Sequence, residues 1–207
     1  MPRVSEMTEE KEYPRRKHPR LTGYDYSESG RYFVTICSDH NKSIFSEIVF
    51  DHSKASENDW FLPVGRGLAP AVCTTDSTRW YFGGYGVKNK MVGQICENLF
   101  EEIEKRFPCL EVEYYVIMPN HIHMIAVLHN PKETAGASPR PTLHDIVCAY
   151  KSLVTRYRNK MFGQTGTRIF QTSYYEHIIR NDREYANIIR YISENPARFA
   201  IDGKEPF

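Results

Sequence analysis

The sequence has no hydrophobic run long enough to cross a membrane. Its apolar runs, such as the Tyr-Tyr-Val-Ile-Met of residues 114–118, fall far short of the ~20 residues that span a bilayer. The first residues also lack the apolar core of a secretory signal. We therefore expect a cytoplasmic protein with no membrane partner.

Paired cysteines and net charge are also scarce. The five cysteines are scattered, and none are spaced as Cys-x-x-Cys, so neither a thiolate zinc site nor a disulfide framework is indicated. The 27 lysines and arginines almost balance the 26 acidic residues, leaving a formal charge of +1. Global charge therefore argues neither for nor against a polyanionic partner, which must be judged from local patches.

What is present describes one globular domain with extensions. A chain of 207 residues that is 41% hydrophobic and 26% charged is typical of a single domain, which we place at residues 21–200. Residues 1–20 mix acids with a basic run at Arg15–Arg20 and predict a flexible arm, or simply a solvated terminus. Residues 51–86 are rich in turn formers and predict a loop insertion or an irregular hairpin, and residues 201–207 form a tail.

Hydrophobic periodicity predicts an alternation of strands and helices. The predicted order is a strand at residues 31–37, a helix at 92–107, strands at 110–118 and 121–128, a helix capped by Thr142, a strand at 170–180 and a helix from Asp182 to the breaker Pro196. This order predicts an α+β fold, a ferredoxin-like sandwich of an antiparallel sheet with helices on one face.

The sharpest local feature is His121-Ile122-His123, which opens a strand directly after a turn. Side chains alternate along a strand, so both histidines project to the same side and could bind one divalent cation. Two imidazoles do not complete a coordination sphere, and the same pattern also suits two hydrogen-bonded or solvent-facing histidines.

A second feature lies in the last predicted helix. Asn187, Tyr191 and Asn195 are spaced by four residues and share one helical face. A phenol and an amide presented together could serve as a nucleophile and an oxygen ligand. The alternative is a half-buried tyrosine with a bonded hydroxyl, followed by an asparagine that ends the helix before Pro196.

Several segments of the sequence resemble motifs of the single-tyrosine HUH transposases. They are HPRLTGYDYSESGRYFVTIC, YYVIMPNHIHMIAVL, VCAYKSLVTRYRNK, IFQTSYYEHIIRND and YANIIRYISENP, in the order of that IS200-like family. The MPNHIH and YI-x-x-NP motifs stand closest to the REP-associated tyrosine transposases. The resemblance covers residues 19–199 apart from much of the insertion, so residues 21–200 would form an HUH transposase domain.

The resemblance implies a site and a reaction. His121 and His123 would be the metal ligands, Asn195 a third ligand where some relatives use Gln, and Tyr191 the nucleophile. His177 matches a recurrent family position and, with Asn187, would line the site. The enzyme would nick and rejoin single-stranded or hairpin DNA through a 5′-phosphotyrosine, with Mg²⁺ or Mn²⁺ as the cofactor. REP-like elements are a possible target class.

Basic residues interleaved with tyrosines follow two of the predicted helices. Positive charge tracks phosphates and aromatic rings stack on unpaired bases, so this mixture suits DNA, although a solvated helix face would look similar. The candidate DNA-binding residues are Lys151, Arg156, Arg158, Lys160, Arg180, Arg183 and Arg190. The arm at Arg15–Arg20 could add phosphate contacts.

Other functions stay open at this point. The same residues could belong to a replication or mobilisation nickase of HUH chemistry, to a metal-dependent hydrolase that uses the histidines alone, or to a catalytically silent DNA-binding protein. The sequence also leaves open whether the protein acts as a monomer or a homodimer, and whether Tyr191 serves its own histidine pair or that of a partner subunit.

Overall fold

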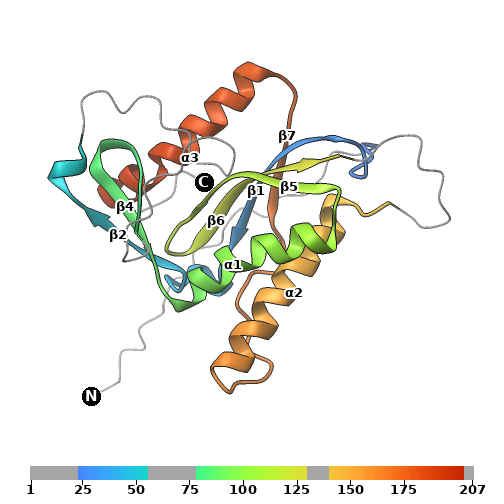
Figure 1. Ribbon diagram of the computed structural model, residues 1–207, viewed down its shortest axis with the longest axis horizontal. Helices are drawn as coiled ribbons and strands as arrows, with labels where there is room; N and C mark the ends of the chain where they lie inside the picture. Colours follow the sequence, from blue (N-terminus) through green and yellow to red (C-terminus); the bar gives the residue numbers. More distant parts are fainter. Residues whose placement is uncertain (1–22, 56–77, 130–139, 203–207) are drawn as a thin grey trace, which may run out of the picture.

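The structure is a computed structural model that describes residues 23–55, 78–129 and 140–202 (Figure 1). The predicted arm at residues 1–20, most of the loop insertion and the end of the tail lie outside the described residues. In chain order the elements are β1 (Gly30–Cys37), η1 (Asp39–Asn41), β2 (Ser46–Phe50), η2 (His52–Lys54), β3 (Thr78–Trp80), η4 (Phe82–Gly84), β4 (Tyr85–Asn89), α1 (Met91–Arg106), β5 (Leu110–Ile117), β6 (His121–Leu128), α2 (Leu143–Met161), β7 (Tyr175–Ile179) and α3 (Asp182–Asp202).

The main sheet is antiparallel, with the strand order β5-β6-β1-β7. Between β1 and β5 the chain forms β2, β3, β4 and then α1, and α2 connects β6 to β7. Strand β1 lies between β6 and β7, although neither is next to it in sequence. This order arises because the connections that contain the helices carry the chain across the sheet, as in a ferredoxin-like sandwich. The α+β class with an antiparallel sheet is therefore confirmed.

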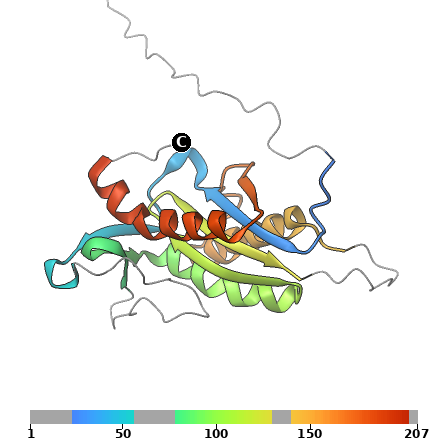
Figure 2. The ribbon, with the colours of Figure 1, turned by 90° about the horizontal axis from the view of Figure 1, so that it is seen from above.

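The helices do not all share one face of this sheet, which differs from the expectation. Val34 and Ile36 of β1 point into the core beneath α1 and α2. Phe33 and Ile125 point into a second core, which Ile192 of α3 joins. In Figure 1 α1 and α2 lie side by side and α3 lies apart from them, and in Figure 2 strands β5 and β6 run between α3 and α1. Both faces of the sheet are apolar, and each therefore needs a helical cover.

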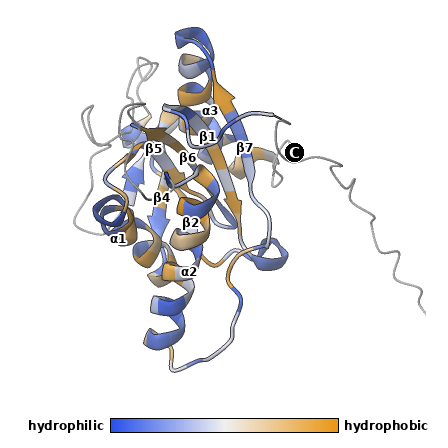
Figure 3. Ribbon diagram, turned by 90° about the vertical axis from the view of Figure 1, so that its right-hand side faces the viewer, coloured by the Kyte–Doolittle hydropathy of each residue, from blue (hydrophilic) through white to orange (hydrophobic). Residues whose placement is uncertain are grey.

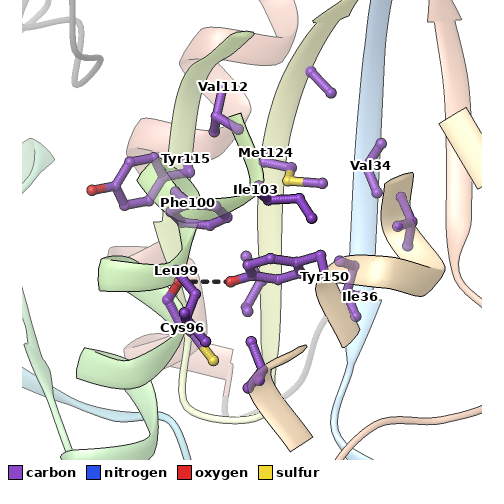
Figure 4. Close-up of a cluster of buried hydrophobic side chains, with 14 of the residues drawn as sticks. Val34, Ile36, Cys96, Leu99, Phe100, Ile103, Val112, Tyr115, Met124 and Tyr150 are labelled. Carbon is purple, nitrogen blue, oxygen red and sulfur yellow. Dashed lines mark hydrogen bonds between the residues drawn. The ribbon is translucent and has the colours of Figure 1, made fainter. Parts of the chain in front are cut away.

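The larger core lies between the sheet and the pair α1 and α2 (Figure 4). Phe100 of α1 stacks on Tyr150 of α2, with ring centroids 5.1 Å apart, and the Tyr150 hydroxyl donates a hydrogen bond to the Cys96 carbonyl. Burial raises the pKa of Tyr150, because the phenolate would be desolvated. Helix α2 begins as expected at Thr142, which forms a reciprocal capping box with Asp145.

A second, three-stranded sheet with the order β2-β4-β3 precedes α1. Strands β3 and β4 form an irregular hairpin through η4, one of the two alternatives expected for the insertion. Strand β2 was not anticipated, because its pairing with β4 joins segments that are distant in sequence.

Two predicted boundaries are wrong. Strand β7 spans only Tyr175–Ile179, within the longer predicted segment. Helix α3 does not end at Pro196 but continues through it to Asp202. A proline inside a helix removes one hydrogen bond and crowds the preceding turn. Here Ala197 is buried and Phe199 packs on the second core, and this burial offsets that cost. Within the described residues, we find no helix of the length and apolarity that a membrane span requires.

Candidate active site

Strand β6 brings His121 and His123 to the middle of the main sheet. In the antiparallel register, Cys37 of β1 lies opposite His121, and Thr35 lies opposite His123. Both histidines therefore point to the face that α3 covers, the same face as Phe33. Their ring centroids lie 4.3 Å apart, and both side chains are fully buried.

The Nδ1 atom of each imidazole is held by a neighbouring oxygen. His121 Nδ1 lies 2.8 Å from Oδ1 of Asn120, an amide oxygen that can only accept, so this nitrogen donates. His123 Nδ1 lies 2.8 Å from the Thr35 hydroxyl. With a proton on Nδ1, each ring presents the lone pair of Nε2, which is the form that binds a metal.

Helix α3 places Tyr191 over His123 of the same chain. The Tyr191 hydroxyl lies 3.4 Å from His123 Nε2, and the two ring centroids are 5.2 Å apart. Phe33 packs against both rings, at 5.2 Å from that of His123 and 6.0 Å from that of Tyr191. Tyr191 is half-buried, so its ring is held by packing while part of it stays accessible to a substrate.

Asn195, one helical turn after Tyr191, completes the cluster. Its side chain is 2% exposed, and its Nδ2 lies 3.5 Å from His123 Nε2. Its Oδ1 has no hydrogen-bond partner among the described residues. A buried acceptor without a partner is costly, so an oxygen ligand at this position fits the residues present. Among the described residues, no group of three or more His, Cys, Asp or Glu side chains is placed to hold a metal. A cation here would instead use two imidazoles and an amide.

His177 and Asn187 occupy different surroundings. His177 of β7 lies opposite Phe33 and therefore on the site face, but its Nε2 lies 2.5 Å from Glu184 of α3. Glu184 also accepts a 2.7 Å hydrogen bond from the backbone N–H of Arg180. This bond and the His177 contact hold the pKa of Glu184 below its ordinary value. Asn187 is exposed, one turn before Tyr191.

The candidate DNA-binding residues divide between the two faces of the sheet. Arg180, Arg183 and Arg190 are exposed on and beside α3, on the Tyr191 face. The other four lie on α2, which packs against the opposite face. The sequence grouped both sets together as candidate DNA-binding residues, because it does not show which face each helix covers. The α2 set is Lys151, Arg156, Arg158 and Lys160.

Comparisons with known proteins give distant similarities. No family model matches the chain. An uncharacterised protein from Haemophilus influenzae is 27% identical over 200 residues, covering 90% of this chain and 91% of its own length. A solved REP-associated tyrosine transposase bound to a REP hairpin is 17% identical, with a TM-score of 0.41, over 82% of this chain and 67% of its own. A candidate transposase from Deinococcus radiodurans R1 is 16% identical, with a TM-score of 0.42, over 86% of this chain and 96% of its own.

Four residues that contact the cluster or hold α3 over it were not singled out in the sequence. They are Phe33, Thr35, Asn120 and Glu184. The alternation of β1 puts Phe33 and Thr35 on one face, and Asn120 directly precedes His121, so a local signal existed for these three. The link of Phe33 and Thr35 to the histidines depends on the register of β1 against β6, which sequence periodicity does not give.

Proposed function

We propose that the protein is a transposase-type DNA strand transferase that nicks and rejoins single-stranded or hairpin DNA through a covalent link to Tyr191. The observation that carries the proposal is the approach of the Tyr191 hydroxyl to His123, beside a second buried histidine and the Asn195 oxygen. A nucleophile beside a cluster of metal-ligand type is the arrangement that phosphoryl transfer by a tyrosine requires.

The reaction follows from the chemistry of a phenol and a phosphodiester. The Tyr191 oxygen forms a bond to phosphorus while the bond from phosphorus to the 3′ oxygen breaks. The phenolic proton is lost to solvent, and the departing oxygen takes up a proton and becomes a 3′-hydroxyl. The product is a 5′-phosphotyrosine, which conserves the bond energy, so attack by a 3′-hydroxyl can reverse the step without ATP. A free phenol has a pKa of ~10 and is a poor nucleophile at neutral pH without help.

The residues that would hold a cation are His121, His123 and Asn195. Their two nitrogens favour Mn²⁺ over Mg²⁺ on ligand softness, although both ions accept the amide oxygen. When bound, a divalent cation supplies positive charge against the phosphate oxygens and lowers the barrier to attack. Thr35 and Asn120 contact the Nδ1 atoms of the imidazoles, and a proton on each Nδ1 would leave Nε2 to bind the cation.

The DNA partner is supported by charge near the nucleophile. Arg183 and Arg190 are seven residues apart and therefore lie on one side of α3, and both are exposed. Arg180 is exposed just before the helix. These guanidinium groups would hold the phosphates that flank the cleaved bond.

The deciding experiment is covalent trapping. Wild-type protein is incubated with Mn²⁺ and a labelled single-stranded oligonucleotide carrying a hairpin, and the products are separated under denaturing conditions. We expect a protein-linked label that disappears in Tyr191→Phe. It should persist in Tyr157→Phe, because Tyr157 is exposed on α2, which packs on the other face of the sheet. A full-strength adduct in Tyr191→Phe would overturn the proposal.

Native gel retardation with the same oligonucleotide tests the silent-binding alternative. Retardation by the wild type without any adduct, across a panel of hairpin sequences and both metals, would mean that the protein binds DNA without cleaving it. Retardation together with an adduct supports the transferase.

A further inference from the structure

A basic cavity lies beside α2, on the opposite face of the main sheet from Tyr191. It has a volume of about 490 Å³, and α2 and the segment at residues 168–172 form its walls. Much of α2 is hydrophilic in Figure 3. The cavity is open to solvent, because Ser152, Arg156, Arg168 and Thr172 of its lining are exposed.

The charges at this cavity are all of one sign. Its lining includes Lys151, Arg156 and Arg168 and, among the described residues, no carboxylate. Arg156 and Arg168 are exposed, and neither forms an ion pair with another described residue. Arg158 differs, because its guanidinium is bonded to Gln164 and stacked on Phe162. The two cavity arginines thus keep their bidentate donors for a ligand.

Lys151 shapes the cavity instead of offering a free charge. Its Nζ donates to the carbonyl oxygens of Gln171 and Thr172, at 2.6 and 2.9 Å, and so fixes the wall of the cavity against α2. Burial lowers the pKa of Lys151, because the charged ammonium is partly desolvated. Hydroxyl groups of Ser152 and Thr172 add neutral donors to the lining.

The cavity wall is joined through the backbone to the end of β1, the neighbour of the histidine strand β6. Gln171 N–H donates to the Cys37 carbonyl at 3.0 Å, and Asp39 N–H donates to the Ile169 carbonyl at 2.7 Å. Cys37 in turn lies opposite His121 in the sheet. Adjacent strands are ~4.8 Å apart, so the wall lies roughly two strand spacings from His121, at the edge of the sheet.

We propose that this cavity is a phosphate-binding subsite that holds the backbone of the DNA strand at the sheet edge, with Arg156 and Arg168 as its ligands. The assignment to DNA rests on the proposed function. The subsite gives Arg156 of α2 a role although it faces away from Tyr191, since a DNA strand that passes the sheet edge at residues 169–171 reaches both faces. Its chemistry is the recognition of a phosphodiester, without base specificity.

The test measures oligonucleotide binding in a chain that cannot cleave. Arg156→Gln/Arg168→Gln is made in the Tyr191→Phe background, and the Kd of a labelled single-stranded oligonucleotide is measured by fluorescence anisotropy at several salt concentrations. Loss of two phosphate contacts should lower the salt slope by about 1.4, at ~0.7 for each phosphate of a single strand. We expect affinity at low salt to fall by about tenfold.

A matched control removes two exposed cations elsewhere. Lys105→Gln/Arg106→Gln neutralises the end of α1 and should leave the Kd and the salt slope unchanged. Circular dichroism verifies that each variant is folded, and Arg168→Lys, which keeps the charge, should retain the salt slope. A double variant at the cavity that binds like the control variant would overturn the subsite.

A second arm separates nucleic acid from free phosphate. Inorganic phosphate is added to the Tyr191→Phe protein and to the cavity variant, and the Tm is followed. If phosphate raises the Tm of only the protein with an intact cavity while both proteins bind the oligonucleotide equally, the assignment to DNA is wrong. Failure of the proposed function is distinct, because it shows as a missing adduct in the wild type whatever the cavity variant does.

Discussion

At the scale of single residues, each imidazole is held at its Nδ1 atom by one neighbouring oxygen. Asn120 and Thr35 each hold an Nδ1 atom, which leaves the Nε2 atoms for a ligand. Such outer contacts typically change metal affinity or activity by ~10–100-fold when they are removed. The hydroxyl of Thr35 is therefore as much a part of the site as the histidine that it contacts.

We expect Thr35→Val to weaken Mn²⁺ binding by ~10–100-fold. The substitution keeps the side-chain shape in β1 but removes the oxygen that holds His123 Nδ1, so the ring can turn and change tautomer. Isothermal titration with Mn²⁺ measures the loss. Thr35→Ser keeps a hydroxyl and should restore binding, and equal affinities in the valine and serine variants would show that the hydroxyl has no such role.

At the scale of elements, the position of α3 over the sheet decides what Tyr191 can reach. Two polar contacts hold the start of the helix. His177 contacts Glu184, and Tyr185 donates a 2.7 Å hydrogen bond to Glu113 of β5. These contacts lie one to two turns before Tyr191, so they set the height and rotation of the helix at Tyr191.

We expect Glu184→Gln to lower the free energy of unfolding at pH 7, because the amide loses the charge that favours the helix N-terminus and the His177 contact. The pKa of Glu184 lies below its ordinary value in the folded chain. Its stabilising effect is therefore complete above that ordinary value and is lost as the pH falls through the folded pKa. Urea unfolding at pH 7 and pH 3 should show a difference in the free energy of unfolding between variant and wild type that is smaller at pH 3. Glu102→Gln, at an exposed position of α1, should show no difference, and an unchanged Glu184→Gln difference at pH 3 would contradict the assignment.

The start of α1 depends on a glycine. A Cβ at Gly93 would overlap the backbone carbonyl oxygen of Phe45, which also accepts a hydrogen bond from Lys90 N–H. Alanine favours helix over glycine by about 1 kcal/mol. The backbone of Phe45 cannot move aside as a flexible side chain can, so the steric overlap outweighs this helix propensity.

Gly93→Ala should therefore destabilise the protein by about 1–3 kcal/mol in urea unfolding. Asn98→Ala, at an exposed position of the same helix, provides the control and should be neutral or slightly stabilising. If the Gly93→Ala protein were as stable as the Asn98→Ala protein, α1 could move away from the Phe45 backbone at no cost, and the close contact at Gly93 would not limit stability.

At the scale of the whole molecule, one chain assembles the complete cluster. Tyr191 lies 3.4 Å from a histidine of its own chain. The fold achieves this by covering one face of the sheet with α1 and α2 and the other with α3. A nucleophile donated by a partner subunit is not required by this arrangement.

A mixing experiment tests that arrangement. His121→Ala/His123→Ala and Tyr191→Phe proteins are combined and assayed for adduct formation. We expect no recovery, because each chain supplies both parts of its own site. Recovery to a substantial share of wild-type adduct would show that the tyrosine is exchanged between subunits.

Local patterns in the sequence determined the helices, the strands of the main sheet and which site residues share a face, apart from the ends of β7 and α3. Alternation along a strand put His121 and His123 on one side, and the spacing of four put Tyr191 and Asn195 on one helical face. The capping residue Thr142 and the apolar stripes of α1 and α2 were equally readable. Each of these features depends only on neighbours within about two turns of chain.

Only the tertiary structure decided which groups meet. The register that sets Thr35 against His123, the face that α3 covers, and the passage of α3 through Pro196 all depend on burial between distant segments. The same cause divided the basic residues between two faces and placed Arg168 beside α2. Periodicity states which side of an element is apolar, whereas the partner of that side is selected by packing across the whole chain.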